Sequence, residues 1–204
     1  FDLQHEQQAR HVGPLGEGDP VEVRGGGTLS INFDLDNFGN VLVEDGQLVV
    51  GGNVFNGATV HVADLGELSI TGNVDGSGTL DVEGGRLAIG GAVAATQTVD
   101  VGVGDSEIAL SRSDQFAGIL NNLSQGDVLS LGDIDFATAS LGYAGTDEAG
   151  TLSLTDGDGS VANLNLLFSY ATNLTAGDPS AHFAMASDGQ GGTLVTTDLI
   201  KPAA

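Results

Sequence analysis

The chain has 204 residues, of which 28 are acidic and 5 are basic, so its formal net charge is −23. A charge of this sign and size opposes binding to nucleic acid and to anionic membrane surfaces, and we expect neither as a partner. The absence of cysteine excludes disulfides and thiol chemistry. A hydrophobic content of 40% argues against a disordered chain, and no apolar run approaches the ~20 residues that span a membrane.

The polar stretch at residues 1–20 lacks the periodicity of the sequence that follows it. A stack of strands has an exposed edge at its end, and such an edge needs a cover to prevent association. We therefore expect residues 1–20 either to cap the first coil or to act as an arm on a neighbouring subunit. The residues expected to make the subunit contact are Phe1, Leu3, His5, Val12 and Leu15.

Residues 21–110 repeat with a period of 19–21 residues. In each row two short runs alternate apolar and polar residues, as strands do, and turn residues rich in glycine separate the runs. The runs begin at Val21, Val41, Val60, Leu80 and Val99, and again at Leu29, Leu48, Leu68, Leu87 and Ile108. A third, weaker apolar column contains Phe33, Val54, Val74 and Val93.

A fixed period of this length is typical of stacked-repeat proteins, because one row cannot bury its own apolar side chains. We predict an all-β fold with a parallel β-solenoid of about five coils of 19–20 residues over residues 21–110. Each coil is expected to contain two or three strands. Four valines, one per coil, are expected to share an interior column: Val43, Val62, Val82 and Val101.

Acidic residues are frequent at the outward positions of the predicted strands; they include Glu22, Glu44, Asp81, Glu83 and Asp100. We interpret this face as a solvated surface, with a ladder of calcium ligands as the alternative. His61 is isolated among these positions, and Arg86 is expected to pair with nearby Glu83.

Residues 111–198 depart from the regular period and are predicted to form a β module that caps or continues the stack. Its first part, residues 111–132, is interpreted as a short helix or a wide coil that leads into a strand at Val128–Leu131. The rest is predicted as antiparallel strands at Ala137–Tyr143, Thr151–Thr155, Val161–Tyr170, His182–Ala186 and Thr193–Thr197. Residues 199–204 are expected to form an exposed tail.

Four segments follow one another in a recognisable order: Phe116-Ala-Gly-Ile-Leu120, Gln125-Gly-Asp-Val-Leu-Ser-Leu131, Gly150-Thr-Leu-Ser-Leu-Thr-Asp-Gly157 and Asp188-Gly-Gln-Gly-Gly-Thr-Leu194. Together with the glycine-rich coils, they resemble the C-terminal segments of large secreted bacterial β-solenoid surface proteins. These are the autotransporter-passenger-like and type I secreted adhesin-like proteins. The resemblance covers most of residues 21–198. It implies a secreted, extracellular or cell-surface location and a structural or adhesive role.

The candidate metal ligands are Asp156, Asp158 and Ser160, which resemble the opening of an EF-hand calcium loop. However, Val161 stands where that loop has glycine, and Leu167 stands where it has its glutamate. The segment is therefore interpreted first as a turn and second as a calcium site. Calcium is the one cofactor that the sequence suggests.

No residue is proposed as catalytic, because the chain contains no GxSxG, phosphate-loop or dinucleotide motif. The favoured function is an extracellular structural protein, a homo-oligomer or filament that forms a bacterial surface fibre, sheath or biofilm-matrix filament. The first alternative is a calcium-assisted adhesin or glycan-binding module. The second is a polysaccharide lyase or epimerase-like enzyme, although few aromatic side chains of the solenoid are expected at the surface to stack sugar rings.

Overall fold

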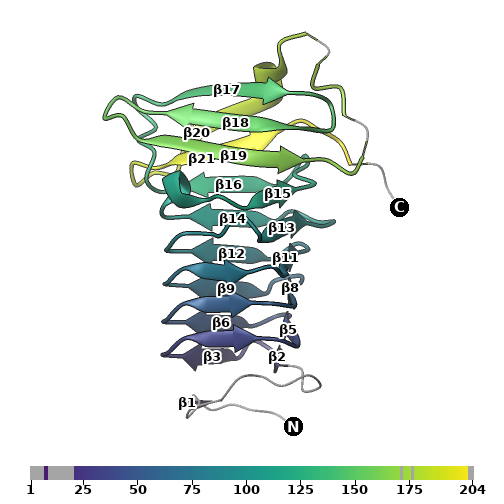
Figure 1. The fold of residues 1–204 in the computed structure, drawn as a ribbon, viewed down its shortest axis with the longest axis vertical. Coiled ribbons are helices and arrows are strands. Elements are labelled where there is room, and N and C mark those ends of the chain that lie inside the picture. The colour runs from purple at the N-terminus through teal and green to yellow at the C-terminus, as the bar shows by residue number, and fades with distance from the viewer. Residues whose placement is uncertain (1–6, 9–20, 171, 176, 202–204) are drawn as a thin grey trace.

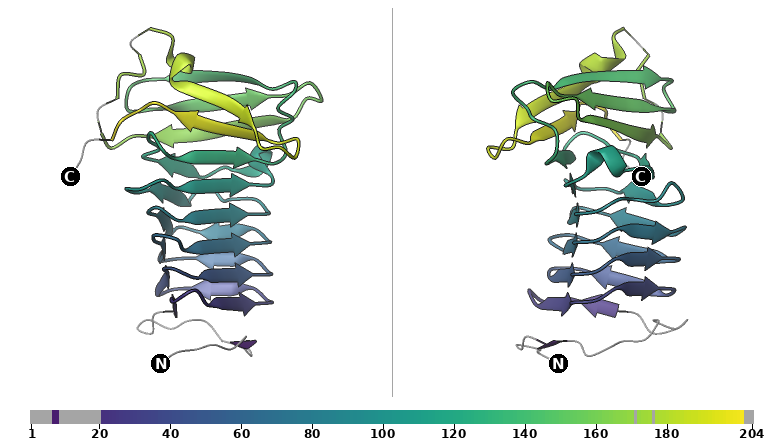
Figure 2. Two further views of the ribbon diagram at one scale, coloured as in Figure 1. Left: turned by 180° about the vertical axis from the view of Figure 1, so that it is seen from behind. Right: turned by 60° about the vertical axis from the view of Figure 1, so that its left-hand side comes forward.

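A computed structural model describes residues 7–8, 21–170, 172–175 and 177–201. The chain forms a stack of parallel coils, and a wider antiparallel module closes the stack at its C-terminal end (Figure 1). Strands of successive coils lie directly above one another in every view (Figure 2). The predicted all-β class, with a parallel β-solenoid followed by a β module, is confirmed.

The stack contains about six coils rather than five. The first three have three strands each: β2 (Val21–Val23), β3 (Thr28–Ile31) and β4 (Leu35–Asn37); β5 (Asn40–Val43), β6 (Gln47–Val50) and β7 (Val54–Asn56); β8 (Thr59–Val62), β9 (Glu67–Ile70) and β10 (Val74–Gly76). The next three have two each: β11 (Thr79–Val82) and β12 (Arg86–Ile89); β13 (Thr98–Val101) and β14 (Glu107–Leu110); β15 (Ile119–Asn121) and β16 (Val128–Leu131).

The sixth coil lies in the segment 111–132, for which the sequence predicts a short helix or a wide coil. Its helical part is limited to the 3-10 turn η1 (Ser113–Gln115), and residues 119–121 form a strand that pairs with β13. The wide coil is therefore the correct alternative. The strand at Val128–Leu131 is confirmed as β16.

Three sheets run along the stack. Sheet A has the order β1-β3-β6-β9-β12-β14-β16-β21-β20, and its first strand, β1 (Gln7–Gln8), pairs with β3. Sheet B has the order β10-β7-β4, and single bridges at Val93 and Phe116 continue its direction into the fourth and fifth coils. Sheet C has the order β17-β18-β19-β15-β13-β11-β8-β5-β2.

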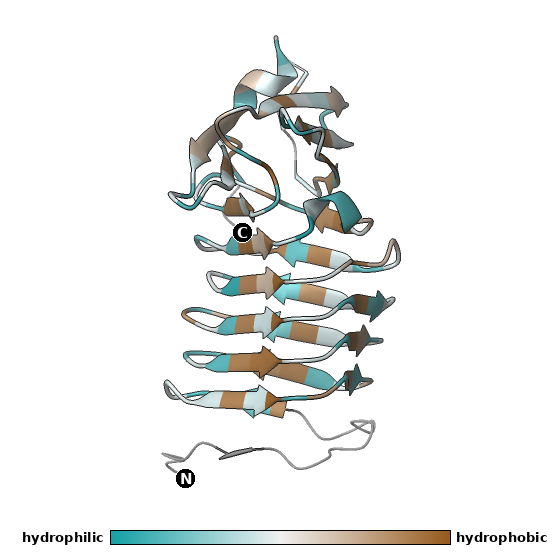
Figure 3. Ribbon diagram, turned by 90° about the vertical axis from the view of Figure 1, so that its left-hand side faces the viewer, coloured by the Kyte–Doolittle hydropathy of each residue, from teal (hydrophilic) through white to brown (hydrophobic). Residues whose placement is uncertain are grey.

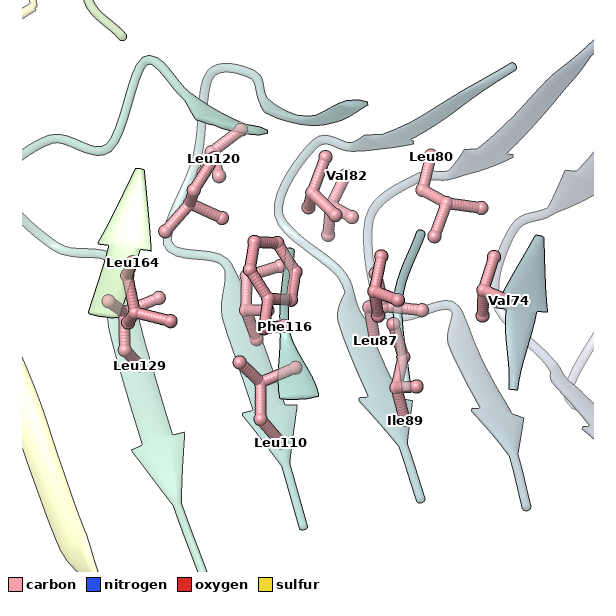
Figure 4. Close-up of a cluster of buried hydrophobic side chains, with 14 of the residues drawn as sticks. Val74, Leu80, Val82, Leu87, Ile89, Leu110, Phe116, Leu120, Leu129 and Leu164 are labelled. Atoms are coloured by element: carbon pink, nitrogen blue, oxygen red, sulfur yellow. The ribbon is translucent and has the colours of Figure 1, made fainter. Parts of the chain in front are cut away.

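The interior of the stack is a continuous apolar column. Val23, Val43, Val62, Val82 and Val101 pair in register along sheet C, and none is more than 5% exposed. Apolar and polar residues alternate along many of the strands, with runs of three apolar residues in β5 and β6 as exceptions (Figure 3), and the apolar side chains of successive coils meet inside the stack (Figure 4). Full burial of one such side chain stabilises the fold by about 1.5–3 kcal/mol, so the stacked coils stabilise one another.

The third interior column differs from the prediction in its first coil. Leu35, not Phe33, pairs in register with Val54, and Leu35 is 6% exposed. In the first four coils the residue of this column lies four positions after the last buried residue of the second strand, as Leu35 does after Ile31. Phe33 is only partly buried against the core.

Buried amides form a polar ladder inside the stack. The Asn37 side-chain amide donates to the side-chain carbonyl of Asn56 at 2.9 Å, and the Asn56 amide donates to Gln97 at 3.2 Å. Gln97 also donates to the backbone carbonyls of Asn56 and Asp75, both at 2.8 Å. All three amide side chains are 0% exposed. Gly76 occupies the register position between Asn56 and Gln97, and a Cβ there would collide with the Asn56 carbonyl.

The C-terminal module continues two sheets and changes the direction of their strands. β19 (Val161–Leu167) pairs parallel to β15, and β18 (Ala149–Thr155) and β17 (Ser140–Gly145) then add antiparallel strands to sheet C. In sheet A, β21 (Thr193–Thr197) pairs antiparallel to β16, and β20 (Phe183–Ser187) follows it. A 3-10 turn, η2 (Pro179–His182), precedes β20.

The five predicted antiparallel strands are present; Thr193–Thr197 has the predicted bounds and the other four have shifted ends, with His182 ending the 3-10 turn instead of starting a strand. The expected exposed tail fits Ile200, which is 72% exposed, but not Leu199, which is 5% exposed. Lys201 donates to the carbonyl of Val101 at 3.3 Å, which holds the tail against the fifth coil. Within the part of the chain that is described, no helix has the length and apolar character to cross a bilayer.

Candidate functional site

The candidate calcium ligands lie in the turn that joins β18 to β19. The two carboxylate oxygens of Asp156 accept hydrogen bonds from the backbone amides of Asp135, Asp158 and Ser160 at 2.9–3.1 Å. These bonds, with that from Asp135 as the largest cause, lower the pKa of Asp156 despite its partial burial. Asp158 and Ser160 thus serve Asp156 as amide donors, and the geometry is that of a closed turn.

The described residues of the turn around Asp156 do not contain a cluster of three possible metal ligands from His, Cys, Asp or Glu. Among the residues that the structure describes, no group of three or more His, Cys, Asp or Glu side chains could hold a metal ion. Calcium binding by Asp156, Asp158 and Ser160 stays a prediction. The predicted subunit-contact residues, Phe1, Leu3, His5, Val12 and Leu15, lie outside the described residues.

A column of charged and polar side chains runs along the outer face of sheet A. Arg86 forms ion pairs with Glu67 at 2.8 Å and with Glu107 at 3.2 Å, and Glu67 also accepts from Gln47 at 3.0 Å. The expected pair with Glu83 is therefore wrong, because the partners of Arg86 come from the coils on either side. These side chains are about half exposed, and such pairs each stabilise a fold by only about 0–1 kcal/mol.

His61 is not isolated, contrary to the expectation from the sequence. Its Nδ1 lies 2.8 Å from a carboxylate oxygen of Asp81, and its Nε2 lies 3.9 Å from Glu83. Asp81 is the register partner of His61 on the next coil. The side chain is thus part of the surface ladder of sheet C, together with Asp100, which accepts from Asn121 and Asn122.

Asp127 is a buried carboxylate at the corner of the sixth coil. It accepts hydrogen bonds from the backbone amides of Ser106 and Ser124 and from the Ser124 hydroxyl, at 2.8–3.0 Å. Burial raises the pKa of Asp127, and these bonds oppose the shift only in part. Both carboxylate oxygens of Asp127 thus accept hydrogen bonds inside the fold and connect the fifth and sixth coils. The side chain is 0% exposed, so it does not face solvent or a substrate.

The solenoid does carry two exposed aromatic rings, which the sequence reasoning missed. Phe38 and Phe55 are 47% and 41% exposed, and their ring centroids lie 5.4 Å apart. They lie on the outer face of sheet B, over the first two coils. Their separation of 17 residues is not the repeat period, so the periodic pattern contains no signal for this contact.

The two ends of the molecule expose different strand edges. Within the described residues, β2 and β4 have no strand partner on the N-terminal side, and β1 covers only a short part of β3. At the opposite end, β17 is the edge of sheet C and β20 is the edge of sheet A. Unpaired backbone groups at such edges are templates for pairing with another chain. On β17 the backbone amide of Tyr143 is not one of these groups, because it donates to the hydroxyl of Ser180 at 3.0 Å.

Neither a protein-family model, nor a curated protein, nor a solved structure matches this chain.

Proposed function

We propose that this protein is an extracellular structural protein that assembles head to tail, as the subunit of a bacterial surface fibre, sheath or biofilm-matrix filament. The observation that supports this proposal best is the continuity of sheets A and C. Each sheet extends from the first coil to the C-terminal module and has one edge at either end. A contact between opposite ends of two copies would extend both sheets and leave new ends free.

A contact of this kind is heterologous, because it joins two different surfaces. Repeated heterologous contacts give an open filament unless the rotation between successive subunits closes them into a ring. The strand β17 of one copy would lie beside β2 of the next and continue sheet C. The expected location, secreted or at the cell surface, rests on the resemblance of the four segments in residues 116–194 to secreted β-solenoid proteins. The acidic outer face would keep such a rod soluble.

Electron microscopy of the purified protein tests the proposal. We expect filaments whose axial repeat equals one subunit, and we expect deletion of residues 1–20 to change their abundance if this segment is the arm. Filaments that are unchanged by the deletion would exclude the arm but not the edge-to-edge contact. A monodisperse monomer at every protein concentration would contradict assembly, and stabilisation of that monomer by millimolar calcium would favour the adhesin alternative.

A substitution in β17 separates edge pairing from other contacts. Gly142 lies in the middle of this edge strand, and a Cβ there would meet nothing within 4 Å. Gly142→Lys places a charge on the edge without disturbing the monomer, and lysine on an edge strand opposes pairing. We expect this variant to abolish filaments, whereas Ser111→Lys, with the same change of charge at an exposed corner of the fifth coil, leaves them intact.

A further inference from the structure

The outer face of sheet B carries an aromatic–acidic patch, which we define as Asp36, Phe38, Phe55 and Asp75. Asp36, Phe55 and Asp75 occupy one column, because β4, β7 and β10 pair in that register. Neighbouring strands are ~4.8 Å apart, so a carboxylate lies one strand away on each side of the Phe55 ring. Phe38 follows β4 directly, and its ring plane is tilted by 44° from that of Phe55.

The geometry of the coils keeps both phenylalanine rings at the surface. Val54 and Val74, which flank the column on the inner side of the same strands, are 2% and 0% exposed and complete the core without the rings. The Phe38 ring lies over Gly57 of the next coil, where a Cβ would come within 3.3 Å of Phe38 Cδ1. The missing side chain at Gly57 thus lets the ring lie against the second coil, beside Phe55.

The two carboxylates of the patch have no partner among the residues that the structure describes. Within the described part of the chain, the side chains of Asp36 and Asp75 take part in no hydrogen bond and no ion pair. They differ in this from Asp81, Glu67 and Glu107, which are paired with His61 or Arg86. The patch therefore offers two exposed ring faces and two uncompensated negative charges on a chain whose net charge is already −23.

This combination favours a cationic ligand with a flat apolar face. The face of an aromatic ring attracts cations, and carboxylates attract them more strongly. A guanidinium can use both features at once, because it stacks on a ring and presents a planar fork of N–H donors to a carboxylate. An ammonium is a compact point charge that lacks this fork, and a neutral sugar leaves the charges unused.

We propose that the aromatic–acidic patch binds an arginine side chain in a basic peptide segment of a partner protein. The guanidinium stacks on Phe55 and Phe38 and donates to Asp36 or Asp75. The patch lies on the outer face of sheet B, whose first strand, β4, is at the N-terminal end of the stack, whereas the proposed head-to-tail contact pairs strands of sheets A and C.

Titration of a labelled peptide against the full chain tests this proposal. The probe is a fluorescent Gly-Arg-Gly-Arg-Gly peptide with blocked ends, measured by anisotropy at low salt and at ~0.15 M salt. We expect saturable binding that Phe55→Ala weakens by about two- to fivefold, the size of one exposed cation–π contact. The double variant Asp36→Asn/Asp75→Asn is expected to weaken binding by about fivefold or more.

Two control variants and two other ligands decide between this site and diffuse attraction. Asp64→Asn/Asp105→Asn makes the same change of two charges at exposed corners of the stack, and Leu65→Ala removes an exposed apolar side chain elsewhere; both should leave the affinity unchanged. Thermal melting of each variant checks that the fold is kept. The peptide in which lysine replaces arginine should bind several-fold more weakly.

Four results would overturn the proposal. They are equal weakening by Asp64→Asn/Asp105→Asn and by Asp36→Asn/Asp75→Asn, no effect of Phe55→Ala, equal affinity for the lysine peptide, and tighter binding of glucosamine oligomers than of the arginine peptide. The last result would assign the patch to an amine-bearing polysaccharide.

Discussion

Leu65 occupies a backbone conformation that favours glycine. Its φ is 62°, and its side chain is 81% exposed, so the residue is strained and contributes little burial. A left-handed conformation costs an L-residue roughly 1–2 kcal/mol, so replacing Leu65 by glycine removes this cost. The greater freedom of glycine in the unfolded chain offsets part of the resulting stabilisation. We expect Leu65→Gly to stabilise the fold by about 0.5 kcal/mol, as measured by urea denaturation.

Val103→Gly is the matched control for this prediction. Val103 is 60% exposed in a neighbouring corner of the stack, but it does not have a positive φ. Glycine at position 103 relieves no strain and only increases the conformational entropy of the unfolded chain. We therefore expect Val103→Gly to destabilise the fold by about 0.5–1 kcal/mol. If both glycine variants lose stability to the same extent, strain at Leu65 is not the reason for its effect.

Asp156 makes the stability of the β18–β19 turn depend on pH. Hydrogen bonds from backbone amides lower its pKa in the folded state below the ordinary value of 3.8. Its ionised form therefore stabilises the fold above pH 3.8, and this contribution is lost as the pH falls through the lower folded pKa. We expect Asp156→Asn to lower the melting temperature at pH 7.

The difference in melting temperature between Asp156→Asn and the natural chain should shrink as the pH falls from about 4 through the lower folded pKa of Asp156, because the carboxylate is then protonated in the folded state as well. Melting curves recorded from pH 7 to pH 2.5 measure it. A difference that stays constant over this range would mean that the charge of Asp156 does not stabilise the turn.

At the scale of elements, the interior ladder of amides connects the first four coils, since Asn37 ends the first coil and Gln97 ends the fourth, directly before β13. Replacing Gln97 by leucine leaves the carbonyl of Asp75 without its side-chain donor, whereas the carbonyl of Asn56 keeps the backbone amide of Gly78 as a donor at 2.8 Å. An unsatisfied buried group costs about 1–3 kcal/mol, so we expect Gln97→Leu to destabilise the fold by about 1–3 kcal/mol in urea denaturation.

Gln47→Leu is the control, since Gln47 donates only to Glu67 on the half-exposed outer face. We expect a change below about 0.5 kcal/mol for this variant. Similar losses for both variants would show that the ladder of Asn37, Asn56 and Gln97 contributes no more than a surface contact.

The period of the sequence predicts what lies one coil away and little else. Val43, Val62, Val82 and Val101 could be placed in one column because they repeat at that period with one face buried. The pairs His61–Asp81 and Arg86–Glu67 are also one period apart, so the register of the coils predicts these pairs although neighbours along the chain do not. Phe33 and Leu35 are both apolar, and only the geometry of the corner places Leu35 in the third column.

Other features depend on the shape of the corners, which the period does not determine. The contact between Phe38 and Phe55 requires the open space at Gly57, and Gln97 reaches Asn56 across two coils because Gly76 lacks a side chain. The closed turn around Asp156 depends on the amide of Asp135, which comes from a distant part of the chain. Local patterns in the sequence contain no signal for these contacts.

For the whole molecule, the net charge of −23 sets how assembly responds to salt. Two copies repel each other at low ionic strength, and raising the salt from ~0.01 to ~0.15 M shortens the screening length from ~30 to ~8 Å. We therefore expect head-to-tail assembly to strengthen with added salt, as followed by light scattering. Filaments that dissolve over this range would indicate contacts made by ion pairs instead of paired strand edges.

Cross-linking between the two edges of sheet C tests head-to-tail assembly most directly. The chain has no cysteine, so thiols can be placed at Glu22 in β2 and at Gly142 in β17 without competing reactions. Neighbouring strands lie ~4.8 Å apart, within reach of a short bifunctional thiol reagent. We predict that the double variant Glu22→Cys/Gly142→Cys gives a ladder of covalent oligomers on a denaturing gel, while each single variant gives only the monomer band. Dimers from a single variant, or monomers alone from the double variant, would contradict the proposed assembly.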